Sequence, residues 1–456
     1  MKQRKPVRSR LFQASYLLTR KSSVISHYRE LMETQWWSYD DLAAMQLEQL
    51  RRLLAFSYAH VPYYHELFDA LGLEAASVTS VDDLQKLPIL TKQTIKQHRA
   101  KLQPTDRKGL RYEHGSTGGS TGEPLQYLMT IEDLTRGIAL LHRGWSYGGY
   151  SPGDGMAKIA GSSLVPTVQS ALQRWAVSLL RNIRSYSTYG MSSEMLMRYT
   201  RSLNDFKPKF LRGYASSIYT VASFIRERDL TVKFRPRAVF TTAEKLLEGQ
   251  RRVIEEVFGT EVFDNYGLND GGVSAYECEQ HNGMHIDMER AILEVVDENG
   301  CQVIGKPGRI LATSLHNYAM PFIRYDTGDL GVMDYCCCSC GRQLPLLKDL
   351  VGRTTDVLEV NGRKIGSPVL TVLLGKFDIE QYQIVQESAD SLTCRIVRGV
   401  GYTKRDEEAI RKSLTSHLGP VGIIFDYATS LNLEAGTKHK FIIDRRGDGR
   451  GAGLPA

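Results

Sequence analysis

Between residues 125 and 267, short apolar runs that suit β-strands alternate with longer segments whose apolar residues recur at helical spacing. This alternation is typical of an α/β fold with a largely parallel sheet, because each helix carries the chain back to the start of the next parallel strand. The expected strands cover residues 125–129, 158–161, 207–214, 238–242 and 262–267, and the expected helices cover residues 131–147, 216–227 and 247–258.

The pattern changes after residue 290. Two apolar runs, 291–297 and 308–314, flank Glu298-Asn299-Gly300, and an Asn-Gly pair favours a tight turn between antiparallel strands. We therefore expect an antiparallel β region to close a large domain. Beyond residue 353, the chain predicts a small α+β lid with strands at 380–387, 391–397 and 421–427 and a helix at 403–417.

We predict an α/β protein in four segments: a basic N-terminal segment (1–37), a large domain (38–352), a small α+β lid (353–444) and a disordered, glycine- and arginine-rich tail (445–456). The large domain is expected to begin with a helix over 38–60, capped by Ser38 with Asp41. This helix should end ahead of Val61-Pro62, because the residue before a proline avoids the α region.

The 456-residue chain carries a net charge of +7, which suits nucleotides, CoA or an anionic membrane surface. It has no arginine-rich tract with interleaved aromatic residues, so we expect no nucleic-acid partner. No apolar run is long enough to span a bilayer. The apolar piece at 11–18 is interrupted by Gln13 and Ser15, which is unlike a secretory signal. The seven cysteines do not form a disulfide framework typical of small secreted proteins, so we expect a cytoplasmic location.

The stretch Ser116-Thr117-Gly118-Gly119-Ser120-Thr121-Gly122-Glu123-Pro124 suits neither helix nor strand. Its glycines permit positive φ and close backbone approach, so successive N–H groups can surround an anion. Its hydroxyls are short donors for phosphate oxygens. A Walker A loop is excluded because no Gly-Lys-Ser/Thr follows at the required spacing. A solvated, hydroxyl-rich turn is the alternative to a phosphate-binding loop.

Four later segments join charged or aromatic side chains to glycine: Tyr266-Gly267-Leu268-Asn269-Asp270, Pro321-Phe322-Ile323-Arg324-Tyr325-Asp326-Thr327-Gly328-Asp329-Leu330, Gly352-Arg353-Thr354-Thr355-Asp356 and Glu434-Ala435-Gly436-Thr437-Lys438-His439-Lys440-Phe441. Read alone, the first two could be plain turns, and a lone loop lysine is normally solvated. In kind and in order, however, these segments and the glycine-rich loop resemble the motifs of the adenylate-forming enzymes, the superfamily of acyl-CoA synthetases.

The resemblance implies a site for ATP or AMP. Asp329 would bind both ribose hydroxyls, since a carboxylate accepts two hydrogen bonds side by side. Tyr266 would lie by the adenine, and Asp270 would offer the hard oxygen that Mg²⁺ prefers. Lys438 would be the catalytic lysine of adenylation. The predicted nucleotide-binding residues are Ser116, Thr117, Gly118, Gly119, Ser120, Thr121, Gly122, Glu244, Tyr266, Gly267, Asn269, Asp329 and Arg353.

Some positions depart from the superfamily pattern. Asn269 and Asp270 stand where relatives carry threonine and glutamate, although Asn keeps a hydrogen-bonding group and Asp keeps a carboxylate on a shorter arm. Thr355 occupies the position of an acidic hinge residue in many relatives, and Glu123 the position of a lysine. These departures leave open a degenerate, non-catalytic member of the superfamily.

Cysteine and histidine residues form a separate pattern. Cys278-x6-His285 and Cys338-x-Cys340 supply a Cys₃His set, which suits a closed, structural tetrahedral Zn²⁺ site. Cys336 and Cys337 are additional thiols, and His281 is a competing ligand. Free buried cysteines are the alternative.

Three features narrow the resemblance to the phenylacetate–CoA ligase branch. They are the cysteine–histidine pairs and the segments Val61-Pro62-Tyr63-Tyr64 and Leu211-Arg212-Gly213-Tyr214-Ala215-Ser216-Ser217. Within that branch, the chain is similar to CapK-like proteins, which are linked to capsular or exopolysaccharide synthesis. The resemblance covers residues from about 38 to 444. Tyr214 and Ala243 lie where we expect the neighbourhood of the acid pocket.

The resemblance implies ATP-dependent activation of a small carboxylic acid to an acyl-adenylate, followed by transfer to CoA. One alternative enzyme is an adenylyltransferase without a thiol step, similar to coenzyme F synthetases. Another class is an assembly protein that serves polysaccharide machinery and contacts a membrane peripherally through its basic segment, residues 1–20.

Overall fold

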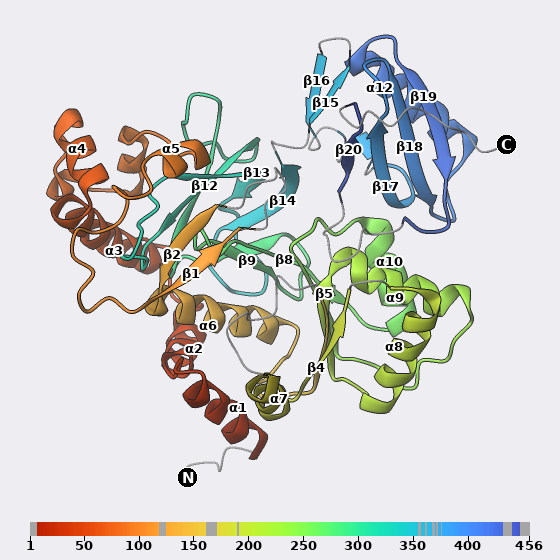
Figure 1. Ribbon diagram of the computed structural model, residues 1–456, viewed down its shortest axis with the longest axis horizontal. Helices are drawn as coiled ribbons and strands as arrows, with labels where there is room; N and C mark the ends of the chain where they lie inside the picture. Colours follow the sequence, from red (N-terminus) through yellow and green to blue (C-terminus); the bar gives the residue numbers. More distant parts are fainter. Residues whose placement is uncertain are drawn as a thin grey trace.

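The computed structural model describes residues 7–117, 125–160, 171–188, 191–353, 357–360, 363–366, 370, 373–374, 376–431 and 440–446 (Figure 1). Two large sheets form the main body, and a smaller sheet near the C-terminus lies above one side of it (Figure 1). In the described part of the chain, no helix has both the length and the apolar character that crossing a membrane requires.

The first large sheet has five parallel strands in the order β4-β3-β5-β6-β7. Alternate side chains of these strands serve two cores: Leu211 and Val239 pack with the helices of one face, whereas Phe210 and Phe240 pack with Trp145 on the other. The elements are β3 (Met156–Ala160), β4 (Ile183–Ser187), α8 (Ser193–Phe206), β5 (Phe210–Tyr214), α9 (Ala215–Glu227), β6 (Ala238–Thr242), α10 (Glu248–Phe258) and β7 (Val262–Phe263). The predicted α/β architecture is confirmed.

The second large sheet has seven strands in the order β11-β12-β13-β14-β10-β9-β8, and every pair is antiparallel. Its strands are β8 (Asn265–Gly267), β9 (Ser274–Glu277), β10 (Met284–Ile286), β11 (Ala291–Val296), β12 (Pro307–Ser314), β13 (Tyr325–Asp334) and β14 (Leu346–Arg353). The predicted turn lies between β11 and β12, where the Gly300 N–H donates to the Asp297 carbonyl. β12 begins only at Pro307, so the connection is longer than a two-residue hairpin.

Helices near the N-terminus cover the second sheet. Leu50, Leu54 and Phe68 share one core with Ile292 and Phe322 of this sheet region. The Ser38 hydroxyl accepts from the Asp41 N–H at the start of α3, and this helix ends at His60, as the sequence predicted. Pro62 opens a further helix, α4, which was not predicted. The elements are α3 (Tyr39–His60), α4 (Pro62–Leu71), η1 (Ala75–Ser77), η2 (Val81–Lys86) and α5 (Lys92–Gln97).

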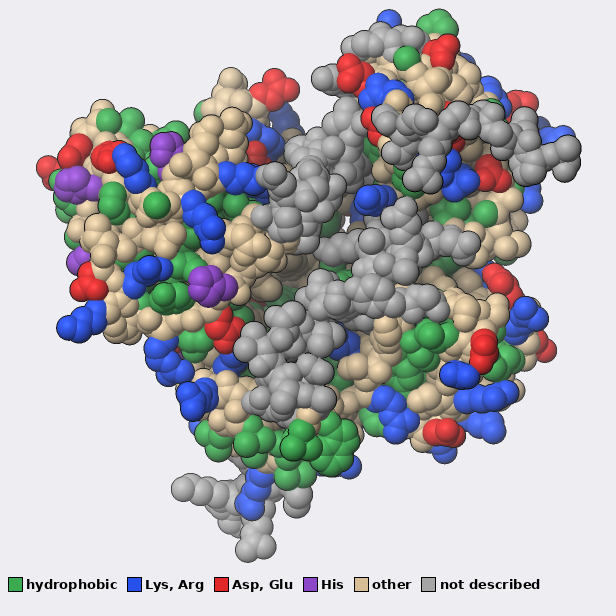
Figure 2. All heavy atoms as spheres, in the orientation of Figure 1, with side chains coloured by type: hydrophobic (Ala, Val, Ile, Leu, Met, Phe, Trp, Pro, Cys, Tyr) green, Lys and Arg blue, Asp and Glu red, His purple; other side chains and the backbone are tan. Residues whose placement is uncertain are grey.

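The described residues ahead of residue 38 also pack on the main body. They form α1 (Val7–Leu18) and α2 (Ser23–Thr34), which lie beside α6 (Ile131–Tyr147) and α7 (Ala171–Arg181) at the lower edge of the molecule (Figure 1). Val24 and Leu31 of α2 are buried against Ala139 and Leu140 of α6. Hydrophobic side chains gather on the surface over α1 and α7 (Figure 2).

A four-stranded sheet, β19-β18-β17-β20, forms the C-terminal part. The elements of this part are β15 (Val357–Val360), β16 (Arg363–Gly366), β17 (Ile379–Gln386), β18 (Ser391–Arg398), α12 (Lys404–Leu418), β19 (Gly422–Tyr427) and β20 (Ile442–Asp444). Glu380 joins this sheet to α9, because its carboxylate accepts from the Tyr219 hydroxyl at 2.5 Å and from Arg226 at 2.9 Å. The strand–strand–helix–strand order expected for this region is present.

Candidate active site and metal-ligand cluster

The chain passes directly from the parallel sheet to the antiparallel sheet at Asp264. β7 ends at Phe263 and β8 begins at Asn265, so the residues that follow lie where the two sheets meet. The Thr241 hydroxyl donates to Asp264 Oδ1 at 2.6 Å, and burial raises the pKa of this carboxyl to about 6. This crossing positions the Tyr266–Asp270 segment at the junction, a location that favours ligand binding.

Two tyrosine–aspartate hydrogen bonds connect the β8 segment with β13. The Tyr266 hydroxyl donates to Asp329 Oδ2 at 3.0 Å, and the Tyr325 hydroxyl donates to Asp270 Oδ2 at 2.8 Å. All four residues are buried. Each segment therefore supplies one phenol and one carboxylate, and each carboxylate is oriented by the other segment.

The two phenols are fixed as hydrogen-bond donors. Burial and the negative charge of Asp329 raise the pKa of Tyr266 well above its usual value. Burial and Asp270 likewise raise the pKa of Tyr325. Because both hydroxyls stay protonated, both bonds persist across the physiological pH range.

The glycine-rich loop is closed at its base by an antiparallel pair, β1 (Tyr112–Ser116) and β2 (Gln126–Thr130). The Thr117 N–H donates to the Leu125 carbonyl at 3.0 Å, and the Leu125 N–H donates to Thr117 Oγ1 at 3.0 Å. Ser116 Oγ accepts from Gln126 Nε2 at 3.1 Å. The predicted phosphate-binding residues Gly118, Gly119, Ser120, Thr121 and Gly122 lie outside the described residues.

The base of this loop is near Asp270. Burial is the main reason why the pKa of Tyr127, on β2, is raised, and the charge of Asp270 adds to the effect. Tyr127 also fills the space beside Gly115, where an added Cβ would meet its ring at 2.3 Å. The loop stem and the Asp270 carboxylate therefore belong to one region.

Glu244 follows β6 and is turned toward the start of α9. Its Oε2 accepts from the Ser216 N–H at 3.0 Å, which places a carboxylate against the positive end of that helix. The preceding residue, Ala243, has φ +67°, a conformation that L-residues rarely adopt. Tyr214, the residue that precedes α9, is buried. The structure thus gives Glu244 a contact with α9, and its nucleotide role stays a prediction.

The remaining predicted residues divide into two groups. Gly267 and Asn269 are exposed next to the buried Tyr266 and Asp270. Arg353 ends β14 opposite Asp329 in the strand register, so its backbone lies beside the site. The hinge position Thr355 and the predicted catalytic Lys438 lie outside the described residues.

Sequence reasoning assigned no role to Tyr325. The signal was present, because a strand places residues i, i+2 and i+4 on one face, and Tyr325, Thr327 and Asp329 share such a face. All three side chains are buried, whereas the residues between them are only partly buried. A search for period-two polar residues in this segment would have included Tyr325.

Four potential metal ligands come together beside α6. The ligand atoms of Cys278, His285, Cys338 and Cys340 all lie within 4.8 Å of one another. The Cys278 and Cys338 sulfurs are 3.7 Å apart, and Cys340 Sγ lies 3.3 Å from His285 Nε2. All seven cysteines of the chain are free thiols.

These distances fit a tetrahedral zinc site. Zn–S bonds of about 2.3 Å and Zn–N bonds of about 2.0 Å place neighbouring ligand atoms about 3.5 to 3.8 Å apart. Burial lowers the pKa of His285 to about 4, which keeps its imidazole in the neutral, metal-binding form. Burial and the neighbouring sulfurs raise the pKa of Cys278, so a bound cation would relieve the cost of placing thiolates together.

The two additional thiols, Cys336 and Cys337, and the competing ligand His281 lie outside this four-ligand cluster. His281 Nδ1 is 3.3 Å from the Glu277 carboxylate, and Cys337 is exposed. Cys336 packs at the side of the cluster with its sulfur outside the four-ligand set. The Arg342 guanidinium lies 3.9 Å from the centre of the Tyr147 ring, which connects the cluster loop to α6.

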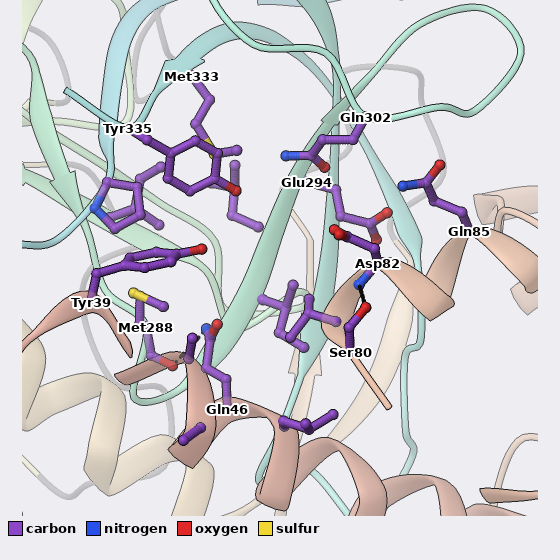
Figure 3. A pocket seen from close by; sticks show the side chains of 18 of the residues that line it. Tyr39, Gln46, Ser80, Asp82, Gln85, Met288, Glu294, Gln302, Met333 and Tyr335 are labelled. Atoms are coloured by element: carbon purple, nitrogen blue, oxygen red, sulfur yellow. Dashed lines mark hydrogen bonds between the residues drawn. The ribbon is translucent and has the colours of Figure 1, made fainter. Parts of the chain in front are cut away.

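A cavity of about 290 Å³ lies elsewhere, between α3, η2 and the second sheet (Figure 3). Tyr39 and Tyr335 stand at one end, and Asp82 and Glu294 at the other (Figure 3). The Glu294 carboxylate already accepts from Arg324 Nε at 3.1 Å. Among the described residues, none that was predicted to bind nucleotide or metal lines this cavity.

Known proteins resemble this chain in sequence along most of its length. A phenylacetate–coenzyme A ligase of Thermus thermophilus is 29% identical over 373 residues, which cover 76% of this chain and 78% of the relative. The protein CapK of Staphylococcus aureus is 24% identical over 440 residues, which cover 93% and 94%. No model of a protein family matches the chain.

Solved structures share the fold. The 2-hydroxyisobutyryl-CoA ligase in its postadenylation state, in complex with an acyl-AMP (R3-HIB-AMP), matches with a TM-score of 0.70 at 20% identity, over 92% of this chain and 93% of that one. The same ligase in complex with 2-HIB-AMP and CoA, in the thioesterification state, matches with a TM-score of 0.60 over the same shares. In the order of its motifs and in two long sequence matches, the chain is similar to the adenylate-forming superfamily, in the branch of the phenylacetate–CoA ligases and CapK.

Proposed function

We propose that the protein is an AMP-forming acid–CoA ligase. In the first step, a carboxylate oxygen of the acid attacks the α-phosphorus of ATP, and the bond to the pyrophosphate leaving group breaks. In the second step, the thiol sulfur of CoA attacks the acyl carbon, the thiol proton is lost, and AMP leaves. ATP, a small carboxylic acid and CoA are therefore the substrates.

The observation that carries this proposal is the reciprocal Tyr266–Asp329 and Tyr325–Asp270 pairing. It holds two carboxylates at the junction of the sheets, close to the stem of the glycine-rich loop. Asp329 would bind the ribose hydroxyls, because a carboxylate can accept two hydrogen bonds side by side. Ser116 and Thr117 already hold the ends of the loop, whose backbone N–H groups would surround the phosphates.

Asp270 would hold Mg²⁺, and it fits this role as a hard oxygen donor with only one oxygen engaged by Tyr325. The ion, when bound, supplies positive charge against the phosphates. Lys438 would add a cation that stabilises the charge developing in the first step. Glu244, Gly267, Asn269 and Arg353 complete the proposed nucleotide site.

The unit over residues 353–444 is proposed as a lid that carries Lys438 to the nucleotide. Ile396, Ile410 and Leu414 are fully buried in the core of this part, which also includes Leu247, at the start of α10 in the large domain. Apart from Leu247, the residues of this core belong to the proposed lid, as expected of a unit that moves as a rigid body. We place the hinge next to Arg353.

The Cys₃His cluster is proposed as a structural zinc site. Its four ligands leave no coordination position open for a substrate, and it lies among buried side chains, such as Tyr147 and Leu346. Zinc there would hold the loop over residues 336–342 against β9 and β10.

Transfer to CoA is favoured over adenylyl transfer without a thiol step. Several relatives are phenylacetate–coenzyme A ligases, and the matching fold has been captured with acyl-AMP and CoA together. The likeness to CapK supports capsule or exopolysaccharide synthesis as the setting. A site in the cytoplasm, where ATP and CoA are supplied, belongs to the same proposal.

ATP–pyrophosphate exchange with a panel of aryl and short acyl acids tests the first step, and CoA-dependent release of AMP tests the second. Asp329→Asn should lower acid-dependent exchange by roughly a hundredfold, since a charge-assisted contact to the ribose is lost. Asp326→Asn, in the same strand and partly exposed, is the matched control. Exchange with no acid of the panel, or full activity of Asp329→Asn, would contradict the proposal.

A further inference from the structure

One face of α7 is an exposed apolar stripe. Leu172, Trp175 and Leu179 recur at i, i+3 and i+7, the spacing of a single helix face. They are 74%, 64% and 60% exposed. Large apolar side chains in a continuous exposed row are unusual on a water-facing helix and indicate an interaction surface.

α1 extends this surface. Its residues Leu11, Leu17 and Leu18 are exposed, whereas Phe12 and Tyr16 on its other side are fully buried. The six exposed side chains of the two helices together are called the α1/α7 surface below.

The two helices are fixed side by side. Arg181 at the end of α7 donates from Nε to Ser15 Oγ at 2.9 Å, and its guanidinium lies 4.3 Å from the centre of the Tyr16 ring. The Tyr16 hydroxyl in turn lies 2.6 Å from His142 Nε2 of α6. The α1/α7 surface is therefore held on the main body by contacts on its buried side.

The two chain segments that carry this surface are positively charged. Residues 1–29 contain eight lysines and arginines and no acidic residue, and residues 155–193 contain four and none. Arg8, Arg10 and Arg20 are exposed on or next to α1. Figure 2 shows the hydrophobic side chains at the lower edge with lysine and arginine side chains beside them.

We propose that the α1/α7 surface docks on an anionic lipid bilayer, with both helices lying in the plane of the headgroups. Apolar side chains that enter the acyl boundary, with cations at the level of the headgroups, are what such binding requires. A second copy of the chain fits less well, because two such surfaces would bring like charges together. The C-terminal sheet lies at the opposite end of the molecule, away from the proposed bilayer (Figure 1).

The test is co-sedimentation of the full chain with phosphatidylcholine vesicles, with and without about one third phosphatidylglycerol. We expect the wild type to bind the anionic vesicles. The triple variant Leu172→Ser/Trp175→Ser/Leu179→Ser should bind them roughly tenfold less tightly or worse, because it loses the apolar side chains that enter the bilayer. Ile424→Ser/Val400→Ser is the matched control, because these residues of the C-terminal part are 60% and 99% exposed. Thermal unfolding and ATP–pyrophosphate exchange verify that each variant is folded.

A second measurement reports contact with the lipid directly. Brominated lipids should quench Trp175 fluorescence in the wild type, and Trp175→Phe should lose this quenching while it still binds vesicles. Three results would overturn the proposal: no binding to anionic vesicles, undiminished binding of the triple variant, or a lipid-free dimer that the triple variant dissociates. The last result would assign the surface to a second copy of the chain.

Discussion

The Tyr266 hydroxyl lies 3.0 Å from Asp329 Oδ2, so a side chain of β8 orients a carboxylate of β13. The converse bond, from Tyr325 of β13 to Asp270 after β8, has a length of 2.8 Å. Two motifs that are about 60 residues apart in the sequence thus depend on each other for the position of their acidic groups.

Tyr266→Phe keeps the ring and removes the donor to Asp329. The buried carboxylate then lacks a hydrogen bond worth about 1.5 to 3 kcal/mol, and we expect the KM for ATP to rise roughly tenfold or more. ATP-dependent pyrophosphate exchange measures the effect. Tyr427→Phe is the control, because it removes a tyrosine–carboxylate bond to Glu407 at the surface. An unchanged KM would show that Asp329 does not need Tyr266.

Tyr325→Phe removes the donor to Asp270 instead. If Asp270 holds Mg²⁺, this variant should need several-fold more Mg²⁺ for half-maximal exchange and recover at saturating Mg²⁺. Tyr266→Phe should show the opposite behaviour, with a defect that Mg²⁺ does not repair. Mg²⁺ titrations of both variants at a fixed ATP concentration distinguish the roles of Asp270 and Asp329. Identical Mg²⁺ dependence of the two variants would argue against separate roles for these carboxylates.

Lys438→Ala should abolish adenylate formation, because a cation is lost where charge develops. Thioester formation from a supplied acyl-adenylate and CoA should persist, since the thiol step does not use this lysine. Lys440→Ala, two residues away, is the matched control and should keep both steps. Pyrophosphate release that survives in Lys438→Ala would refute the assignment.

Cys338→Ser should remove the metal from the Cys₃His cluster. Elemental analysis should find about one zinc per wild-type chain and much less in the variant, with a thermal midpoint lower by several degrees, because metal binding contributes to folding. Cys301→Ser changes an exposed thiol outside the cluster and should keep both zinc and stability. A wild-type protein that is stable without any bound metal would contradict the proposal.

The pH dependence of stability should contain a contribution from Asp264. Burial raises its pKa from 3.8 to about 6, so the folded state retains a proton that the unfolded chain releases in this range. The stabilisation is complete below the unfolded pKa and is lost as the pH rises through about 6. Asp264→Asn should therefore gain stability relative to the wild type at neutral pH, by up to about 2 to 3 kcal/mol.

Urea unfolding of both proteins between pH values of about 4 and 8 measures this difference. The exposed Asp205→Asn should follow the wild-type curve at every pH. A constant difference between Asp264→Asn and the wild type over the whole range would mean that the carboxyl titrates normally.

Much of the fold could be predicted because local signals agree with the tertiary structure. The helix expected over 131–147 is present with the same bounds, since Thr130 caps it and its apolar face meets the core. α1 was not predicted, because Gln13 and Ser15 interrupt its apolar run. In the structure, the Ser15 hydroxyl donates to the Phe12 carbonyl at 2.6 Å, which lets a polar residue be buried there.

The short strands of the second sheet show the limit of sequence patterns. β8 and β10 have three residues each, and their pairing with β9 is decided by contacts with the rest of the sheet. The same holds for the site. Asp270, Asp329 and Tyr266 could be identified from their segments. The pairing of each carboxylate with the tyrosine of the other segment depends on how β8 and β13 are placed, which no local pattern specifies.

The hydrogen bonds of Glu380 must break before the C-terminal part can rearrange relative to α9. Moving its sheet off α9 would break the bonds from Tyr219 and Arg226, and a buried carboxylate and phenol would need water or new partners. For an enzyme that adopts two arrangements in each cycle, the speed of that exchange limits turnover. A residue outside both chemical steps would then determine how often they can be repeated.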